Sequence, residues 1–440
     1  MPNVRAQPDD EDSLMDAREE VNEISLDPED WGALRELGHQ MLDDMLSYLE
    51  TLRERPVWQP MPDEVRARFR QPLPVEGEGE AAAYQDFREL VQPYPLGNIH
   101  PRFWGWVIGT GTPFAMLAEM LAAGVNPNLG GGDHAANDVE QQVIDWCKQM
   151  LGYPAEASGL LVSGGSMANL VGLAVARNAR AEIDVRQDGV HAAPREMVLY
   201  ASRETHSSNS RAAELLGLGR AALRLVPVND DFEIDIAALQ GMIAADRAAG
   251  RYPFCVIGHA GTVNTGATDD LNMLADLCER EGLWFHVDGA FGALAALSPE
   301  LAPRVAGMER ADSLAFDMHK WMYLPIEVGC VLVRDQAAHL STFSVTPDYL
   351  AHGTRGAHAG GPWFSEYGLQ LSRGFRALKV WMSFKAHGLD TFRRLIEQNV
   401  AQAQYLAGLV DGEPELERLA PAPLNIVCFR YNPGGLDDAQ

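Results

Sequence analysis

The chain has 440 residues, of which 46% are hydrophobic, and these values are typical of a globular protein with one large domain or two domains. Its formal net charge of −27 would repel phosphate backbones and anionic lipid, and no run of 18 apolar residues occurs, so neither nucleic acid nor a membrane is an expected partner. Five scattered cysteines without a CxxC pair indicate reduced thiols in the cytoplasm, and no motif requires a metal.

The N-terminal part is predicted to form an acidic tail, residues 1–26, followed by a helical arm, residues 27–112. Residues 1–50 contain 15 acidic residues against three arginines, so the tail is expected to be disordered. Asp27 and Pro28 suit the N-cap and the first position of a helix. Its apolar face is predicted to comprise Leu34, Leu37, Met41, Leu42, Met45 and Leu49. An arm that exposes such a face usually packs against another subunit or domain.

From about residue 113, helices and short apolar strands alternate, which predicts a large domain, residues 113–370, with a mostly parallel α/β sheet. Helices are expected at residues 114–123, 140–151, 169–180, 235–248 and 270–281. Strands are expected at residues 159–162, 197–201, 254–258, 283–287, 313–316 and 329–333. A small C-terminal domain, residues 371–440, is predicted from helices at 374–386 and 391–409 and a strand at 424–431.

The stretch LLVSGGSMANL, residues 160–170, joins a strand to a helix through Ser163, Gly164, Gly165 and Ser166. Glycines allow backbone N–H groups to turn inward, and the start of a helix carries partial positive charge, so a phosphate would fit there. A simple tight turn between a strand and a helix explains the two glycines equally well.

Two further candidates follow expected strands. In LWFHVDGAFGA, residues 283–293, Asp288 lies at the carboxyl end of a buried strand, where its partner is either an arginine or a protonated ring nitrogen of a ligand. Gly289 and Ala290 leave room for a flat group beside it. His206 follows a strand and precedes a helix, so it is either a capping or core histidine, which is the simpler interpretation, or it stacks on a ligand ring.

Lysine is rare in this chain, which has 31 arginines and four lysines, Lys148, Lys320, Lys379 and Lys385. In AFDMHKWM, residues 315–322, Lys320 follows an expected strand at its carboxyl end, where ligands bind in open α/β sheets. A lysine in a partly apolar site can form a Schiff base, and the other three lie on expected helices. A phosphate cradle, a buried acid, an imidazole and an amine at one sheet edge together fit pyridoxal 5′-phosphate (PLP).

The motifs SGGSMAN, ETHSSNSRA, FHVDGAFGA, ADSLAFDMHKW and RGFRALKVW resemble, in matching order, those of the group II PLP-dependent decarboxylases, the family of aromatic-L-amino-acid decarboxylases. The resemblance runs from about residue 27 to the end. It implies a fold-type-I aminotransferase-like large domain, an N-terminal helical flap, a small α+β C-terminal domain and an obligate homodimer with active sites at the interface. Relatives continue past the strand that ends near Tyr431, so the C-terminal domain here looks truncated.

The resemblance also assigns most of the candidate residues to the cofactor. It implies that Lys320 forms the Schiff base and that Asp288 pairs with the ring nitrogen. Ala290 and His206 are expected against the two faces of the ring. The remaining cofactor contacts that it implies are Gly165, Ser166, Thr262 and His319, the last of these at the phosphate.

On the substrate side, TFSVTPDYLAHG, residues 342–353, resembles the mobile catalytic loop of the family and makes Tyr349 the proton donor, in concert with His206. Trp106 and Val107 match the segment that lines the substrate side-chain pocket. Val263 departs from the family pattern, because relatives often carry a second threonine there.

The predicted function is therefore PLP-dependent decarboxylation of L-amino acids. Phe103, Trp104 and Trp106 favour an aromatic substrate, although these side chains would also suit a core. The alternatives are an aromatic aldehyde synthase, which Tyr349 argues against, a decarboxylase of non-aromatic amino acids, and a catalytically silent PLP-binding interaction protein.

Overall fold

The computed structural model describes residues 25–345, 356 and 359–434, and contacts within the chain separate two units, Met1–Leu96 and Gly97–Gln440. The described part of the first unit is helical, and its elements are α1 (Trp31–Glu50), η1 (Leu52–Glu54), α2 (Asp63–Arg68), α3 (Glu80–Asp86) and η2 (Phe87–Val91). Asp44 of α1 accepts a 2.8 Å hydrogen bond from the Tyr84 hydroxyl of α3. The arm predicted for residues 27–112 thus comprises residues 27–96 of this unit and the first 16 residues of the second.

The predicted start of the first helix was wrong by three residues. Asp30, rather than Asp27, is the N-cap of α1, and its Oδ1 accepts hydrogen bonds from Gly32 N at 2.7 Å and Ala33 N at 3.2 Å. Pro28 therefore lies before the helix. A proline fixes φ alone, whereas a carboxylate that reaches the free N–H groups of the first turn determines where the helix begins.

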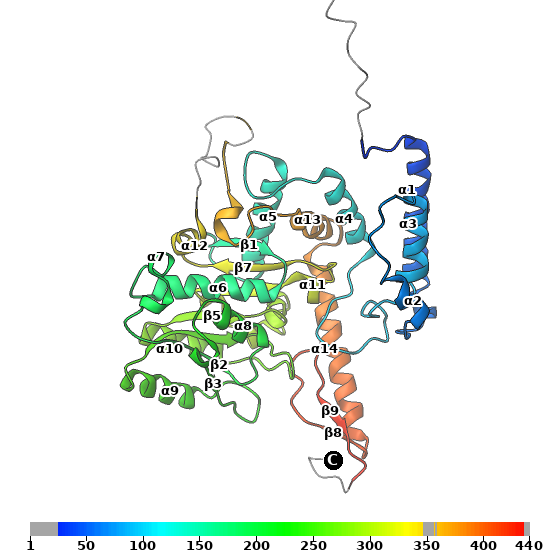
Figure 1. Cartoon of the computed structure of the whole chain (residues 1–440). Coiled ribbons are helices and arrows are strands. Elements are labelled where there is room, and N and C mark those ends of the chain that lie inside the picture. Colours follow the sequence, from blue (N-terminus) through cyan, green and yellow to red (C-terminus); the bar gives the residue numbers. More distant parts are fainter. Residues whose placement is uncertain (1–24, 346–355, 357–358, 435–440) are drawn as a thin grey trace, which may run out of the picture. The chain divides into compact units, whose positions relative to one another are not determined.

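The second unit is built on a seven-stranded sheet with the order β1-β7-β6-β5-β4-β2-β3 (Figure 1). Its strands are β1 (Ser158–Val162), β2 (Met197–Ser202), β3 (Leu223–Val226), β4 (Tyr252–His259), β5 (Trp284–Asp288), β6 (Ser313–Asp317) and β7 (Gly329–Val333). Only β7 runs antiparallel to its neighbours, β1 and β6, and the other pairs are parallel. The predicted mostly parallel α/β sheet is confirmed.

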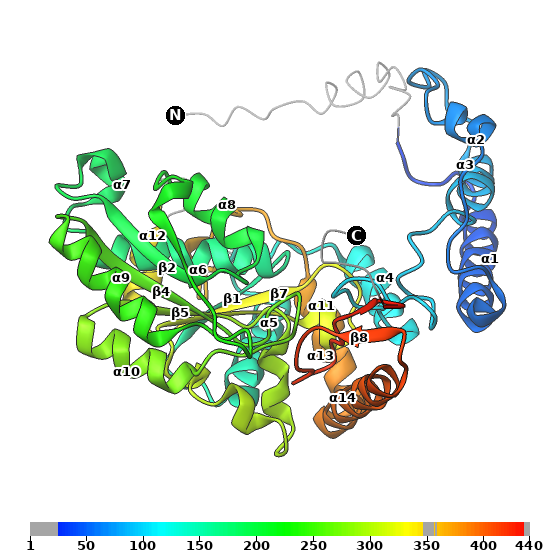
Figure 2. The same cartoon turned by 90° about the horizontal axis from the view of Figure 1, so that it is seen from below.

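Helices cover both faces of this sheet, and Figure 2 shows α8 and α10 on opposite sides of it. The helices that accompany the sheet are α4 (Pro113–Val125), α5 (Ala135–Met150), α6 (Gly165–Arg180), α7 (Val185–Asp188), α8 (Ser207–Leu215), α9 (Ile236–Ala248), α10 (Leu271–Glu281), α11 (Met318–Trp321) and α12 (Gln336–Phe343). No helix in the described parts of the chain has the length and apolar character that crossing a membrane demands.

The C-terminal region consists of α13 (Arg376–His387), α14 (Leu389–Gly412) and a two-stranded antiparallel sheet of β8 (Leu416–Arg418) and β9 (Phe429–Tyr431). The single strand predicted at residues 424–431 was wrong for its first five residues. Leu424 is fully buried in the main core and Ile426 packs against that core. The apolar run therefore reflects burial of a loop, and only its last three residues pair with a strand.

Candidate active site

The register of the sheet brings three acidic or basic residues to one edge. His259 at the end of β4 pairs with Asp288 at the end of β5, which in turn pairs with Ala315, two residues before Asp317 ends β6. A cavity of about 420 Å³ lies at this carboxyl edge, where open α/β sheets bind ligands. The predicted residues that line it are Val107, Gly165, Ser166, His206, Thr262, Asp288, Ala290, His319 and Lys320.

Asp288 is buried, and its hydrogen bonds come from amides. Its Oδ2 accepts from Asn169 Nδ2 and from Asn209 Nδ2, each at 2.9 Å, and its Oδ1 accepts from Ala290 N at 3.2 Å. No arginine of the described residues is bonded to it. Burial alone would raise the pKa of Asp288, but the charge of His259 and the hydrogen bond from Asn209 outweigh it, so the pKa lies below its usual value. The site therefore holds an ionised acceptor that faces the cavity.

Lys320 also reaches the cavity, where its Nζ lies 3.0 Å from Asp317 Oδ2. The other three lysines are engaged elsewhere. Lys148 is buried and pairs with Asp145 at 2.8 Å, Lys379 is buried beside Glu119, and Lys385 lies over the Trp381 ring. Lys320 is thus the lysine that the fold presents to the cavity.

The turn between β1 and α6 has the features of a phosphate site. Gly164 is the N-cap of α6, and no side chain caps the helix, so backbone N–H groups of its first turn remain for an anion. A Cβ on Gly164 would lie 3.0 Å from His319 Cε1, and a Cβ on Gly165 would lie 2.9 Å from Ala290 Cβ. A side chain at Gly165 would therefore displace its neighbours, and one at Gly164 would press on His319.

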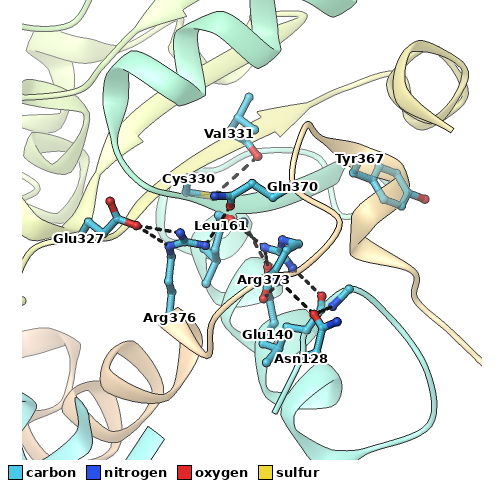
Figure 3. A network of polar contacts seen from close by, with 12 residues as sticks. Asn128, Glu140, Leu161, Glu327, Cys330, Val331, Tyr367, Gln370, Arg373 and Arg376 are labelled. Atoms are coloured by element: carbon cyan, nitrogen blue, oxygen red, sulfur yellow. Dashed lines mark hydrogen bonds and ion pairs between the residues drawn. The ribbon is translucent and has the colours of Figure 1, made fainter. Parts of the chain in front are cut away.

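A buried ion pair fixes the strand that leads into this turn (Figure 3). Arg373 and Glu140 are paired at less than 2% exposure of either side chain. Arg373 donates to Leu161 O at 2.7 Å, and Glu140 accepts from Leu161 N at 3.3 Å. Both bonds hold Leu161, which lies two residues before Ser163, so the pair anchors the end of β1 next to the turn.

His206 and His319 lie at the wall of the cavity. His206 caps α8, because its Nδ1 accepts from Ser208 N at 3.2 Å, and it also borders the cavity. The capping interpretation is therefore confirmed, and His206 also lines the cavity. Burial lowers the pKa of His319, whose Nδ1 lies 3.1 Å from Val328 O.

A smaller pocket of about 150 Å³ adjoins the cavity through Val107, Phe291 and Lys320. Trp106 lines this pocket and is 74% exposed, whereas Trp104, equally exposed, lines neither space. Tyr349 lies outside the described residues. The structure thus brings together the predicted cofactor residues and places Trp106 and Val107 beside them.

Sequence reasoning missed four polar residues of this site, Asn169, Asn209, His259 and Asp317. Asp317 is 2% exposed and its Oδ1 has no hydrogen-bond partner among the described residues. A Cβ on Gly165 or on Gly329 would lie 2.8 or 2.7 Å from one of its oxygens, so glycines make room for this carboxylate. Asp317 could have been recognised in the AFDMHKWM stretch, because it precedes Lys320 by three residues, about one helical turn.

These observations fit PLP. A lysine amine, an ionised buried carboxylate and an uncapped helix start border one cavity, and they suit the aldehyde, the pyridine nitrogen and the phosphate of that cofactor. The fold and the site together define a PLP-dependent enzyme of fold type I.

Comparison with known proteins agrees. Residues 62–432 match the pyridoxal-dependent decarboxylase conserved domain, so the chain belongs to this family and is a PLP-dependent amino-acid decarboxylase. It is 37% identical to an aromatic-L-amino-acid decarboxylase of Bacillus atrophaeus, over 92% of this chain and 82% of that one. It is 31% identical to human histidine decarboxylase, over 92% of this chain and 62% of the relative. The crystal structure of Oryza sativa TDC with PLP and tryptamine has a TM-score of 0.85 at 27% identity, covering 93% of this chain and 85% of that chain.

Proposed function

We propose that this enzyme decarboxylates aromatic L-amino acids and releases the corresponding amine. The observation that carries the proposal is the cavity in which Lys320, Asp288 and the start of α6 meet, beside a pocket that Trp106 lines. The similarity to an aromatic-L-amino-acid decarboxylase supports the aromatic preference. A flat hydrophobic side chain would contact Trp106 and Phe291 in this pocket.

The proposed roles follow from where the side chains lie. Bound PLP supplies a ring that withdraws the negative charge left on the α-carbon when CO2 departs. Lys320 would provide the amine that holds PLP and would take part in product release. Asp288 would accept a hydrogen bond from the protonated ring nitrogen, and Gly165, Ser166 and His319 would hold the phosphate.

The other proposed roles concern the ring faces and the proton. His206 and Ala290 would lie against the two faces of the ring, and Thr262, which is 2% exposed at the cavity wall, would contact the cofactor. Tyr349 donates the proton to the α-carbon.

A screen of CO2 release over all common L-amino acids, with each amine identified by mass, tests the proposed substrate class. We expect the highest kcat/KM with tryptophan, tyrosine or a hydroxylated relative of tyrosine. Highest turnover with histidine, glutamate or a diamino acid would contradict the aromatic preference and would leave the decarboxylase assignment intact.

The proposal includes a homodimer in the cytoplasm, with the tail, the arm and the two domains bounded as predicted. Trp31, Leu34, Met41 and Leu46 of α1 are exposed, and a second subunit would cover them. The five free cysteines suit a reducing compartment. Sedimentation should show a dimer that dissociates or loses stability when residues 1–55 are deleted. A stable, active monomer after that deletion would exclude this assembly.

A further inference from the structure

His259 is a buried histidine at the cavity whose two ring nitrogens are both engaged. It is 2% exposed, and its Nδ1 lies 2.9 Å from Asp269 Oδ2. Its Nε2 lies 2.8 Å from Thr205 Oγ1. Asp269 is itself fixed, because it also accepts from the backbone N–H groups of Ile234 at 2.7 Å and His259 at 2.9 Å. The imidazole is therefore clamped between an acid and a hydroxyl.

The hydroxyl continues the chain of contacts to Asp288. Thr205 Oγ1 accepts from Asn209 Nδ2 at 3.0 Å, and the same nitrogen donates to Asp288 Oδ2 at 2.9 Å. An amide nitrogen carries two hydrogens, so these two bonds use both and fix the orientation of the Asn209 amide. The strand register independently places His259 beside Asp288. His259 is thus coupled to Asp288 in two ways, by its proximity in the sheet and by the hydrogen-bonded side chains of Thr205 and Asn209.

The groups around His259 favour its charged form. Asp269, Asp288 and Glu204 face it with negative charge, and His286, on the neighbouring strand, has its pKa lowered to about 4 by burial, so it is neutral. Lys320 is the further cation that acts on Asp288. Burial alone would lower the pKa of His259, but the hydrogen bond and charge of Asp269, with the charges of Asp288 and Glu204, raise it above its ordinary value. The surroundings of the imidazole therefore favour its protonated form more than water does.

His339 shows what a buried histidine does when its role is structural. It is fully buried, and its nitrogens lie 2.8 Å from Ser158 Oγ and 2.8 Å from Tyr367 O, with no acid among these partners. Burial lowers its pKa to about 4. His339 borders neither the cavity nor the smaller pocket. The acidic partner and the position at the cavity therefore distinguish His259.

We propose that His259, clamped between Asp269 and Thr205, is a positioning residue that keeps Asp288 ionised and directed toward the PLP ring nitrogen. This inference rests on the proposed pairing of Asp288 with that nitrogen. An ionised Asp288 keeps the proton on the ring, and the protonated ring is the form that best withdraws charge from the α-carbon. Without the cation, the proton shared by Asp288 and the ring would move toward the carboxylate.

The first experiment needs no cofactor. The full chain, labelled with ¹⁵N in its histidine rings, is examined by NMR at neutral pH. We expect one histidine to have both ring nitrogens protonated while buried from solvent, and its signal to be missing in His259→Gln and retained in His339→Gln. A neutral His259 at neutral pH would overturn the inference.

The second experiment loads the protein with PLP labelled with ¹⁵N in its ring. The wild type and His339→Gln should give the signal of a protonated ring nitrogen. His259→Gln should move that signal toward the unprotonated value. It should also lower kcat by about tenfold, the change expected if the pKa of the ring nitrogen falls by about one unit. A signal unchanged in a folded His259→Gln protein would overturn the inference.

Two further variants make the result specific. Thr205→Val retains His259, keeps nearly the same side-chain shape and removes the hydrogen-bonded link to Asn209. It should therefore shift the ¹⁵N signal of the PLP ring in the same direction as His259→Gln, by a smaller amount. If His259→Gln fails to fold, Thr205→Val replaces it, and an unchanged ring signal would then overturn the inference.

Asp288→Asn tests the pairing of Asp288 with the ring nitrogen. If Asp288→Asn shifts the signal and His259→Gln does not, the inference about His259 alone fails. If neither shifts it, the pairing of Asp288 with the ring nitrogen fails as well.

Discussion

Two groups of buried charges lie near the carboxyl ends of the strands, and they differ in what their partners are. The side chains of Glu140 and Arg373 are less than 2% exposed, and they bond to each other and to backbone groups of Leu129 and Leu161. The cavity group comprises Asp288, Asp317 and Lys320. There, Lys320 is 24% exposed, and all three side chains line the cavity, which neither Glu140 nor Arg373 does.

The difference separates charges that hold the fold from charges that are available to a ligand. Removing one partner of a buried ion pair such as Glu140 and Arg373 destabilises the protein strongly, because the other charge remains buried. The cavity charges border a space of about 420 Å³, so their remaining bonding capacity points toward a bound molecule. Substitutions in the first group should therefore change stability, and those in the second should change chemistry.

The largest effect is expected from Lys320→Ala. No other lysine lies at the cavity, so the variant should show no turnover and no PLP that borohydride can fix to the protein. Lys385→Ala is the matched control, because Lys385 is exposed, lies over Trp381 and does not line the cavity. Mass spectrometry after reduction measures the attachment. A cofactor adduct in Lys320→Ala at the level of the control would contradict the assignment.

Glu140→Gln should mainly reduce stability. The change leaves Arg373 charged and buried without its acidic partner, and the expected loss is about 3–5 kcal/mol in the free energy of unfolding. Urea unfolding followed by circular dichroism measures this loss. The kcat of the folded fraction should stay within about threefold of the wild type, because Glu140 lies outside the cavity lining. A stable protein with a large loss of kcat would break the distinction between the two groups.

Asp288→Asn should have the opposite result. The amide cannot hold the ring nitrogen protonated, and losing a charge-assisted hydrogen bond of roughly 1.5–3 kcal/mol lowers kcat by at least about tenfold. Cofactor binding and the free energy of unfolding should change far less than in Glu140→Gln. Steady-state kinetics and urea unfolding on the same preparation measure both quantities. Near-normal turnover would remove Asp288 from the chemistry.

The sequence predicted the central strands and the two principal site residues for physical reasons. A strand that is covered on both faces is a continuous apolar run, and this pattern identified β5 and β6. It also gave the positions of Asp288, which ends β5, and of Lys320, which follows β6 by three residues. The edge strand β3 was missed, since its four residues, LRLV, are only partly buried. The other edge strand, β1, is buried along its whole length and was predicted.

The supporting residues of the site were not predictable in the same way. Asn169 and Asn209 lie on α6 and α8, and they meet at Asp288 only because both helices pack beside the sheet. His259 depends on Asp269, ten residues further along, and on Thr205 from a different loop. These contacts arise from tertiary packing between distant segments, and no local spacing in the sequence encodes them.

Tyr349→Phe should change the rate of CO2 release least among these variants. Its main effect should be on which product is formed. Once CO2 has left, the α-carbon either takes a proton, which gives the amine, or reacts with oxygen, which gives an aldehyde, ammonia and peroxide. A tyrosine hydroxyl within reach of the α-carbon donates that proton, and a phenylalanine ring cannot. The variant should therefore make more aldehyde with measurable peroxide under air, while PLP binding and stability stay as in the wild type. Tyr405→Phe, at a position that is 71% exposed, is the matched control. If Tyr349 only packs its loop, both products will slow together, and an unchanged ratio of amine to aldehyde would exclude Tyr349 as the proton donor.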